Sequence, residues 1–206
     1  EVKRFVNLQT ALCYGHPKVV PIDVSEPTNP FTSYGISKTA GEAYLMQTDL
    51  KVVSLRLANI CGPRLAIGPI PTFFSRLKTG KPCFCSDTTR DFLDISDFFN
   101  LIEKVLEDGA PTGLFNVSTG QGYSIHALYD TVCEFLEIDN AGAVPIIPVG
   151  EDDVKDVVLD PRKTQDAFKW KARVSFKETI FNQLSWYEKY GVSEIYSHLS
   201  TPGELK

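Results

Sequence analysis

Long apolar segments and an excess of positive charge are both absent from the 206-residue sequence. No run of 18 apolar residues occurs, so we predict no membrane-spanning helix. Lysine and arginine number 21 against 26 acidic residues, a net charge of -5, so we predict no general nucleic-acid-binding surface. The N-terminus carries no secretory signal, and we therefore expect a cytoplasmic protein.

Metal-binding patterns are also absent. The three histidines are scattered without ligand spacing, and the five cysteines include no C-x-x-C pair. We therefore predict no metal site, and we expect reduced cysteines that pack as small apolar side chains. Cys83 and Cys85 alternate in "PCFCSD", so a strand there would point both thiols to the same face.

An initiator methionine is missing too, and "EVKRFVNLQ" opens the sequence within a predicted buried strand. We therefore expect the chain to be part of a longer protein. Predicted strands alternate with predicted helices, and this order indicates an α/β fold. The strands are predicted at 2–9, 51–59, 81–87 and 113–120, and the helices at 33–47, 71–80, 94–109, 124–138 and 175–191. Ser33 and Ser124 are predicted caps, and Ser175 with Glu178 predicts a capping box.

Two Tyr-x-x-x-Lys spacings occur, Tyr14 to Lys18 and Tyr34 to Lys38. Chance predicts about half a match in a sequence with this many tyrosines and lysines, so the spacing alone carries little weight. The glycine and proline of "YGHPK" prevent a continuous helix across the first pair. A helix over "SYGISKTAGEAYL" instead places Tyr34 and Lys38 on one face. There the ammonium would lower the pKa of the phenol and suit it to acid–base chemistry; the alternative is a solvated helix face with a tyrosine near its cap.

An ordered series of segments resembles one protein family. The segments are "NLQTALCYG", "SYGISKTAGE", "SLRLANICGPR", "TRDFLDISDF", "LFNVSTGQGYSI", "LDPRKTQDAFKW" and "WYEKYG". Over residues 2–191 they resemble, in the right order, the extended short-chain dehydrogenases/reductases of the NAD-dependent epimerase/dehydratase group, which act on nucleotide sugars. The resemblance implies the C-terminal part of a Rossmann-like, doubly wound parallel sheet. It also implies a smaller mixed α/β lobe that binds the nucleotide-diphosphate sugar.

The resemblance implies a catalytic set of Thr10, Tyr34 and Lys38. Thr10 matches the family's serine or threonine, whose hydroxyl hydrogen-bonds the sugar oxygen that is oxidised. Tyr34 would be the base in oxidation and the acid in reduction, while Lys38 would tune it and bind the nicotinamide ribose. The backbone around Leu57 and Ala58 would contact the nicotinamide. NAD is therefore the implied cofactor, with NADP as the alternative.

Asn59 and Arg90 match residues that face the diphosphate of the substrate in this family. A guanidinium fork suits phosphate oxygens geometrically. Asp153 is assigned to the same substrate site, near Gly150, where related epimerases often carry another diphosphate-binding arginine. Arg64 is a less specific candidate, because loop arginines are often surface charges. The alternative for Arg90 is an ordinary salt bridge with a neighbouring aspartate: Asp87, Asp91 or Asp94.

Ala11 and Leu12 stand where dehydratases of this group carry Asp-Glu, directly after the catalytic threonine. Their presence argues against a 4,6-dehydratase. The implied activity is that of a nucleotide-sugar 4-epimerase of the UDP-glucose 4-epimerase type, which transiently oxidises the sugar at C4. An NAD(P)-dependent nucleotide-sugar reductase or dehydrogenase is the enzyme alternative. A non-catalytic relative and a degenerate fragment without function are the others.

A glycine-rich phosphate loop is not found, and in this family that loop belongs to the first strand and helix. We expect that segment to precede the chain. The implied division assigns 1–60 and 94–118 to the Rossmann part, 61–93 and 119–200 to the lobe, and 201–206 to a tail.

A homodimer is the assembly that the resemblance implies, because relatives often dimerise through the helix with the tyrosine and lysine. The residues available for that contact, or for core packing instead, are Ala40, Ala43, Tyr44 and Leu45.

Overall fold

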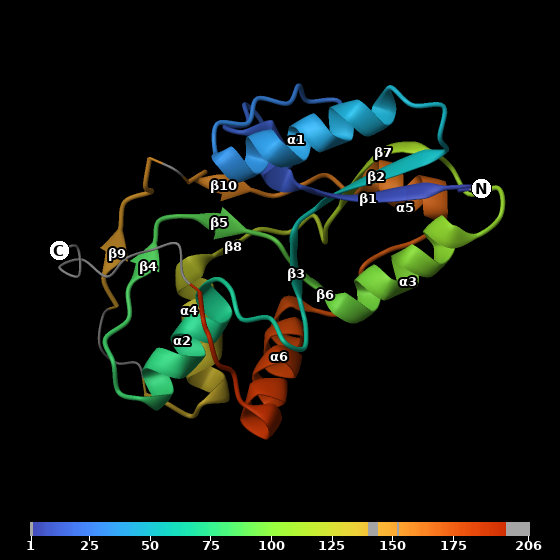
Figure 1. Cartoon of the computed structure of the whole chain (residues 1–206). Coiled ribbons are helices and arrows are strands. Elements are labelled where there is room, and N and C mark those ends of the chain that lie inside the picture. Colours follow the sequence, from blue (N-terminus) through green and yellow to red (C-terminus); the bar gives the residue numbers. More distant parts are fainter. Residues whose placement is uncertain (1, 140–143, 152, 197–206) are drawn as a thin grey trace.

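The computed structural model describes residues 2–139, 144–151 and 153–196. Its largest sheet is parallel, with the strand order β1-β2-β7 and helices on both faces (Figure 1). The strands are β1 (Phe5–Thr10), β2 (Val52–Leu57) and β7 (Gly113–Val117). Helix α1 (Ser33–Met46) covers one face, and helices α3 (Ile95–Leu106) and α5 (Arg162–Phe168) cover the other. The predicted α/β fold with a parallel sheet is confirmed.

Apolar side chains fill the space between this sheet and helices α3 and α5. Side chains alternate along a strand, so Leu55 of β2 and Phe115 of β7 point to the same face. Both are buried, and they pack with α3 residues that recur at helical spacing. Burying a side chain of this size contributes about 1.5–3 kcal/mol, so this cluster is a main source of the sheet's stability. The cluster consists of Val53, Leu55, Leu93, Phe98, Leu101, Val105, Phe115, Val117, Phe168 and Trp170.

A second apolar cluster lies between α2 (Pro69–Lys78), α4 (Ile125–Phe135) and α6 (Phe176–Tyr190), in the lower part of Figure 1. Short strands join these helices to the main sheet. Strands β3 (Asn59–Cys61) and β6 (Phe92–Asp94) pair in parallel, as do β4 (Cys85–Ser86) and β9 (Ile146–Ile147). Strand β5 (Thr89–Arg90) lies between β10 (Asp156–Val157) and β8 (Tyr123–Ser124). This is the smaller mixed α/β part that the resemblance implies.

The helix boundaries follow the capping residues. Ser124 caps α4, and Ser175 with Glu178 forms the predicted capping box of α6. The prediction of Ser33 as the cap of α1 is wrong by one residue. Thr32 caps this helix, because its hydroxyl accepts a hydrogen bond from the Gly35 amide at 3.0 Å. Thr32 retains the extended backbone that a capping position requires.

Strand β1 lies at the edge of the sheet and pairs with β2 alone. Phe5 and Leu8 are 38% and 44% exposed, so the prediction of a buried strand at 2–9 is wrong for these side chains. The reason is that the described residues place no strand along the outer side of β1.

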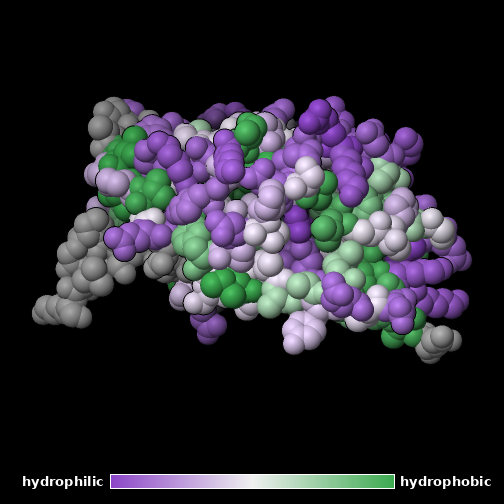
Figure 2. All heavy atoms as spheres, turned by 90° about the horizontal axis from the view of Figure 1, so that it is seen from above, coloured by the Kyte–Doolittle hydropathy of each residue, from purple (hydrophilic) through white to green (hydrophobic). Residues whose placement is uncertain are grey.

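The outer face of α1 is the surface seen in Figure 2, which views the molecule from above. Hydrophobic residues alternate there with hydrophilic ones. Ala40 and Ala43 are exposed, Tyr44 is 80% exposed, and Leu45 is half-buried. Three of the four residues proposed for either a dimer contact or the core therefore lie outside the core of this chain.

The cysteines are unpaired, and Cys13, Cys61, Cys85 and Cys133 are buried as predicted. Burial raises the pKa of the Cys13 thiol to about 12, so this side chain is neutral and packs as an apolar group. Cys83 is only half-buried and lies outside β4, so the prediction of one strand carrying both Cys83 and Cys85 is wrong.

Within residues 2–139, 144–151 and 153–196, no helix combines the length and the apolar character that crossing a bilayer requires. The same residues contain no cluster of three or more potential metal ligands.

The division into a Rossmann part and a lobe stays a prediction, and one packing detail differs from it. Helix α5 lies within the segment 119–200 that was assigned to the lobe, yet Phe168 and Trp170 pack in the core of the main sheet. The predicted tail, 201–206, and the last four residues of the lobe segment lie outside the described residues.

Candidate active site

Thr10 ends strand β1 and begins the 3₁₀ turn η1 (Ala11–Tyr14). Its hydroxyl oxygen accepts a hydrogen bond from the Leu12 amide at 3.2 Å, which caps the turn. This bond uses a lone pair of the oxygen, so the hydroxyl proton can be donated to another group. In the sheet Thr10 is the direct neighbour of Leu57, the last residue of β2. The structure therefore places both predicted residues at the carboxyl ends of adjacent parallel strands.

Helix α1 begins against the η1 turn. A Cβ atom at Gly35 would lie 2.9 Å from the carbonyl oxygen of Leu12, so only glycine allows this approach of helix and turn. Tyr34 is in the first turn of the helix, directly before Gly35, and its side chain is 55% exposed. The phenol is therefore on an accessible surface beside the segment that follows Thr10.

Lys38 lies one turn after Tyr34 on the same helix, as predicted from the spacing. Its ammonium donates a hydrogen bond to the carbonyl oxygen of Leu8 at 2.7 Å. Leu8 is two residues before Thr10 on β1, so the structure brings the lysine to the same end of the strand as the threonine. Two of the three ammonium donors remain for other acceptors.

A buried polar network holds α1 on its face of the sheet. The Glu42 carboxylate of α1 lies 2.6 Å from Nη2 of Arg56 on β2, and their side chains are 6% and 5% exposed. Ser54 donates a hydrogen bond to the same carboxylate at 2.6 Å. Nη1 of Arg56 donates to the Tyr14 hydroxyl, which in turn donates to Asn116 on β7. The network therefore connects α1 to β2, to the turn η1 and to β7.

Tyr14 is therefore a structural residue. Burial raises its pKa to about 12, against the opposing effect of Arg56, so the phenol remains neutral. Lys18 lies outside every helix of the described chain, and the Tyr14–Lys18 spacing does not form a shared helix face. This agrees with the expectation drawn from the glycine and proline between them.

The segment after β2 carries the next predicted residues. The Ala58 amide donates to the Val117 carbonyl at 2.9 Å, which fixes the backbone that was predicted to contact the nicotinamide. Asn59 begins β3, and its side-chain amide donates to the Asp91 carbonyl at 3.0 Å. Asn59 is exposed, and this contact fixes its side-chain amide against the backbone of Asp91.

Arg90 and Asp153, both predicted to bind the substrate, contact each other. Nη2 of Arg90 lies 2.6 Å from Oδ1 of Asp153, and their side chains are 14% and 33% exposed. Nη1 of Arg90 also donates to the carbonyls of Thr89 and Lys155. Burial lowers the pKa of Arg90, and the carboxylate of Asp153 opposes that effect. The pair is half-buried, with the guanidinium held in a fixed plane.

The alternative partners proposed for Arg90 are wrong, because each has another role. Asp87 pairs with Lys155 at 3.2 Å. Asp91 is buried and accepts hydrogen bonds from Thr119 and Gly120, and Asp94 caps helix α3. The correct partner lies 63 residues away in sequence. The acidic residues near Arg90 in the sequence therefore did not indicate its partner, Asp153.

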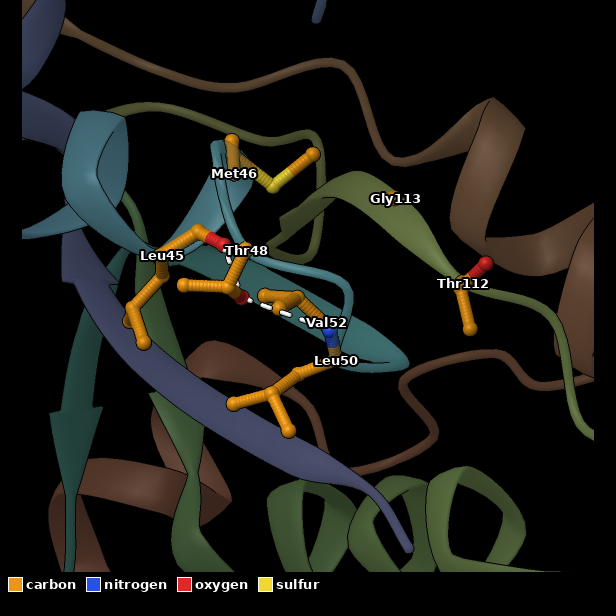
Figure 3. Close-up of a pocket in the computed structure, with 7 residues that line it drawn as sticks. All are labelled: Leu45, Met46, Thr48, Leu50, Val52, Thr112 and Gly113. Atoms are coloured by element: carbon orange, nitrogen blue, oxygen red, sulfur yellow. Dashed lines mark hydrogen bonds between the residues drawn. The ribbon is translucent and has the colours of Figure 1, made fainter.

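The cavity in Figure 3 is separate from these residues. It has a volume of about 120 Å³ and lies at the amino ends of β2 and β7. Its lining residues are Leu45, Met46, Thr48, Leu50, Val52, Thr112 and Gly113. Small-molecule sites usually have about 300 Å³ or more, so this cavity is too small for a nucleotide sugar. The predicted residues lie instead at the carboxyl ends of the strands, where α/β sheets bind nucleotides.

Sequence reasoning missed Gln9, Glu42 and Arg56, whose buried side chains make polar contacts between α1 and the sheet. The available signal was a polar residue within an apolar strand, since "FVNLQT" and "VVSLRL" each contain such positions. Buried polar side chains require hydrogen-bond partners, so they indicate a specific contact even when the partner is unknown.

The residues present fit the nicotinamide-ribose end of a dinucleotide. Lys38 supplies ammonium donors, Tyr34 a phenol, and the ends of β1 and β2 supply backbone groups. These donor types match ribose hydroxyls and a carboxamide.

A family model and several solved structures match this chain over most of its length. A family model described as GDP-mannose 4,6 dehydratase matches residues 1–183. The crystal structure of the Bordetella bronchiseptica enzyme WbmG in complex with NAD and UDP is 62% identical, with a TM-score of 0.91. That match covers 98% of this chain and 65% of WbmG. The UDP-glucose 4-epimerase of Thermotoga maritima, crystallised with UDP-glucose, is 27% identical with a TM-score of 0.81, covering 91% of this chain and 64% of that protein.

Among curated proteins, the dTDP-D-glucose 4,6-dehydratase of Bos taurus is 26% identical over 209 residues, which covers 91% of this chain and 56% of the bovine protein. The chain spans between 49% and 59% of the length of the first two curated relatives that it matches. The family match extends over most of the sequence, and the 62% identity to WbmG extends over nearly all of it. The chain belongs to the GDP-mannose 4,6 dehydratase family, within the NAD-dependent epimerase/dehydratase group of short-chain dehydrogenases/reductases.

Proposed function

We propose that the protein containing this chain is a nucleotide-sugar 4-epimerase that uses NAD. The observation that carries the proposal is the arrangement at the end of β1. Lys38 reaches the Leu8 carbonyl at 2.7 Å, so the helix with Tyr34 lies against the strand that ends at Thr10. Support also comes from WbmG, crystallised with NAD and UDP, and from the UDP-glucose 4-epimerase of Thermotoga maritima.

In this proposal the sugar lies with its 4-hydroxyl between Tyr34 and Thr10. Tyr34 accepts the hydroxyl proton, and the Thr10 hydroxyl donates a hydrogen bond to the same oxygen. The Lys38 ammonium stabilises the phenolate form of Tyr34 and donates to the ribose. Bound NAD would supply the acceptor for the hydride from C4. The same hydride would return to the other face of the keto-sugar while Tyr34 returns the proton to the oxygen, so the carbon is inverted without net oxidation.

The diphosphate end of the substrate is assigned to Arg90 and Asn59. The Asp153 carboxylate holds the Arg90 guanidinium at 2.6 Å, so Asp153 would orient the arginine and contribute to the site through it. This assignment requires the guanidinium to offer its remaining donors to phosphate oxygens, which its fork geometry permits. The homodimer, with the outer face of α1 as its contact, and the cytoplasmic location remain part of the proposal.

An epimerase is favoured over a dehydratase by the two residues after Thr10. Elimination of water needs an acid and a base beyond the tyrosine, and Ala11 and Leu12 have neither. Both side chains pack in an apolar cluster with Tyr14 and Ile22. The turn η1 therefore has no titratable side chain at these two positions, whereas epimerisation needs only the reversible proton transfer of Tyr34.

The test is turnover of UDP-hexoses by the full-length protein with NAD, followed by separation of the two C4 epimers. Tyr34→Phe is expected to abolish interconversion. Tyr44→Phe is the matched control, because Tyr44 is on the same helix and 80% exposed. Stoichiometric formation of NADH would indicate a dehydrogenase instead. Undiminished epimerisation by Tyr34→Phe would disprove the assignment.

A further inference from the structure

Gln9 is a buried polar residue at the end of β1, and the proposed reaction assigns no step to it. Its side chain is 2% exposed. The amide oxygen accepts a hydrogen bond from the Thr10 backbone amide at 2.8 Å. The amide nitrogen donates to the Lys38 backbone carbonyl at 2.9 Å. One side chain therefore joins the strand residue with the proposed catalytic hydroxyl to the helical turn with the proposed catalytic ammonium.

The two contacts of Gln9 require opposite hydrogen-bonding polarity. The Thr10 amide needs an acceptor, and the Lys38 carbonyl needs a donor. A primary amide presents both groups in one plane, as does a neutral carboxylic acid, whereas a carboxylate presents acceptors only. The side chain must also reach from the strand to the helix, and the side chains of serine and asparagine are shorter than that of glutamine. The chemistry and the length at position 9 are therefore both specific.

This contact is distinct from the ion pair that anchors α1 elsewhere. Glu42 joins the helix to β2 through Arg56, whereas Gln9 joins it to β1, the strand of Thr10. The Lys38 ammonium adds a second bond to β1 at Leu8. Both the backbone and the side chain of Lys38 are thereby held by the last residues of this strand.

We propose that Gln9 is a positioning residue that holds Thr10 and Lys38 in a fixed arrangement around Tyr34. The inference rests on the proposed function. Without the Gln9 amide, the Thr10 N–H loses its acceptor, and the backbone carbonyl of Lys38 loses its bond to β1, so only the ammonium bond to Leu8 remains. A shift of about 1 Å between reacting groups lowers a rate by up to about 100-fold.

The experiment compares Gln9→Met, which has similar length but no hydrogen-bonding amide, with Gln183→Met in the full-length protein. Gln183 is the matched control, because it is 1% exposed and lies on α6, where its amide contacts Tyr187. Gln9→Met is expected to lower kcat about 10- to 100-fold with KM changed less than about threefold. Gln183→Met should leave the kcat of the folded protein within about threefold. Amide exchange at Thr10, measured by NMR, should become faster only in Gln9→Met.

Gln9→Glu adds a signature that a purely structural role would not give. A neutral carboxyl at position 9 can accept from Thr10 and donate to the Lys38 carbonyl, whereas a carboxylate repels that carbonyl. The kcat of Gln9→Glu relative to the wild type is therefore expected to rise as the pH falls. The charged groups packed around position 9 are Lys38 and the Glu42–Arg56 pair, and all three are present in both proteins.

The possible outcomes separate this inference from the proposed function. If the wild type epimerises and Gln9→Met retains its kcat, or loses no more than Gln183→Met, Gln9 has no positioning role. If the wild type does not epimerise, the proposed function is wrong, and exchange at the Thr10 amide decides about Gln9. Unchanged exchange in Gln9→Met would then overturn the inference as well.

Discussion

Replacing Arg56 by methionine tests the buried network under α1. Arg56 and Glu42 lie 2.6 Å apart with side chains only 5% and 6% exposed. Burial alone would lower the pKa of Arg56, but the hydrogen bonds to Glu42 and Tyr14 outweigh it and raise the pKa above its usual value. The guanidinium is thus a permanent cation. Its removal leaves the Glu42 carboxylate buried with Ser54 as its remaining partner in the network.

The expected cost of Arg56→Met is about 3–5 kcal/mol of unfolding free energy, the usual effect of leaving one buried charge unpaired. The double variant Glu42→Gln with Arg56→Met removes both charges and keeps an acceptor for Ser54. It is expected to recover at least half of that loss, because an uncharged pair avoids the desolvation cost. The two substitutions are therefore expected to be strongly non-additive.

The assay is urea unfolding of the full-length protein, followed by circular dichroism, for the wild type, both single variants and the double variant. Lys155→Met is the matched control, because its ammonium pairs with Asp87 at the surface and the two side chains are 63% and 59% exposed. Little change is expected there. A loss below about 1 kcal/mol for Arg56→Met, or simple additivity in the double variant, would refute the role of this pair.

Four further substitutions have defined outcomes. Gly35→Ala places a Cβ 2.9 Å from a carbonyl of η1, so we expect a destabilised helix start and a kcat at least about tenfold lower, measured with a thermal unfolding curve and steady-state kinetics. Arg90→Leu is expected to raise KM for the nucleotide sugar at least about tenfold, and Asp153→Asn to raise it less; an unchanged KM for Arg90→Leu would exclude a phosphate contact. The Arg162 guanidinium lowers the pKa of Asp160, so Asp160 stabilises the fold above its unfolded-state pKa and loses that effect as the pH falls through its folded-state pKa. Asp160→Asn should therefore be less stable than the wild type at neutral pH but equal to it in acid, and a difference that persists in acid would contradict this reasoning.

The sequence was sufficient for those features that depend on short segments. The capping box needs only Ser175 and Glu178, which are three positions apart in the sequence, and the structure contains it. The same holds for the helical spacing of Tyr34 and Lys38, because every α-helix brings residues four apart to one face.

Contacts between distant segments were not predictable in the same way. Arg90 had three nearby aspartates, yet its partner Asp153 becomes adjacent only when β5 and β10 pair. Gln9 could be recognised as an unusual residue in a strand, but its two partners are set by where α1 crosses β1. The exposure of Leu8 likewise depends on what lies beside the strand, which alternation of residues along β1 does not encode.

The two faces of the parallel sheet differ in how they constrain the sequence. On the α3 and α5 side the contacts are apolar, and such packing tolerates exchanges that conserve volume. On the α1 side the contacts of Gln9, Glu42 and Arg56 depend on the identity of each donor and acceptor. Mutational tolerance should therefore alternate along β2 with a period of two, Leu55 being replaceable by similar residues and Arg56 not. Variation needed to adapt the protein to a new temperature can thus accumulate on one side of the sheet without moving the residues on the other.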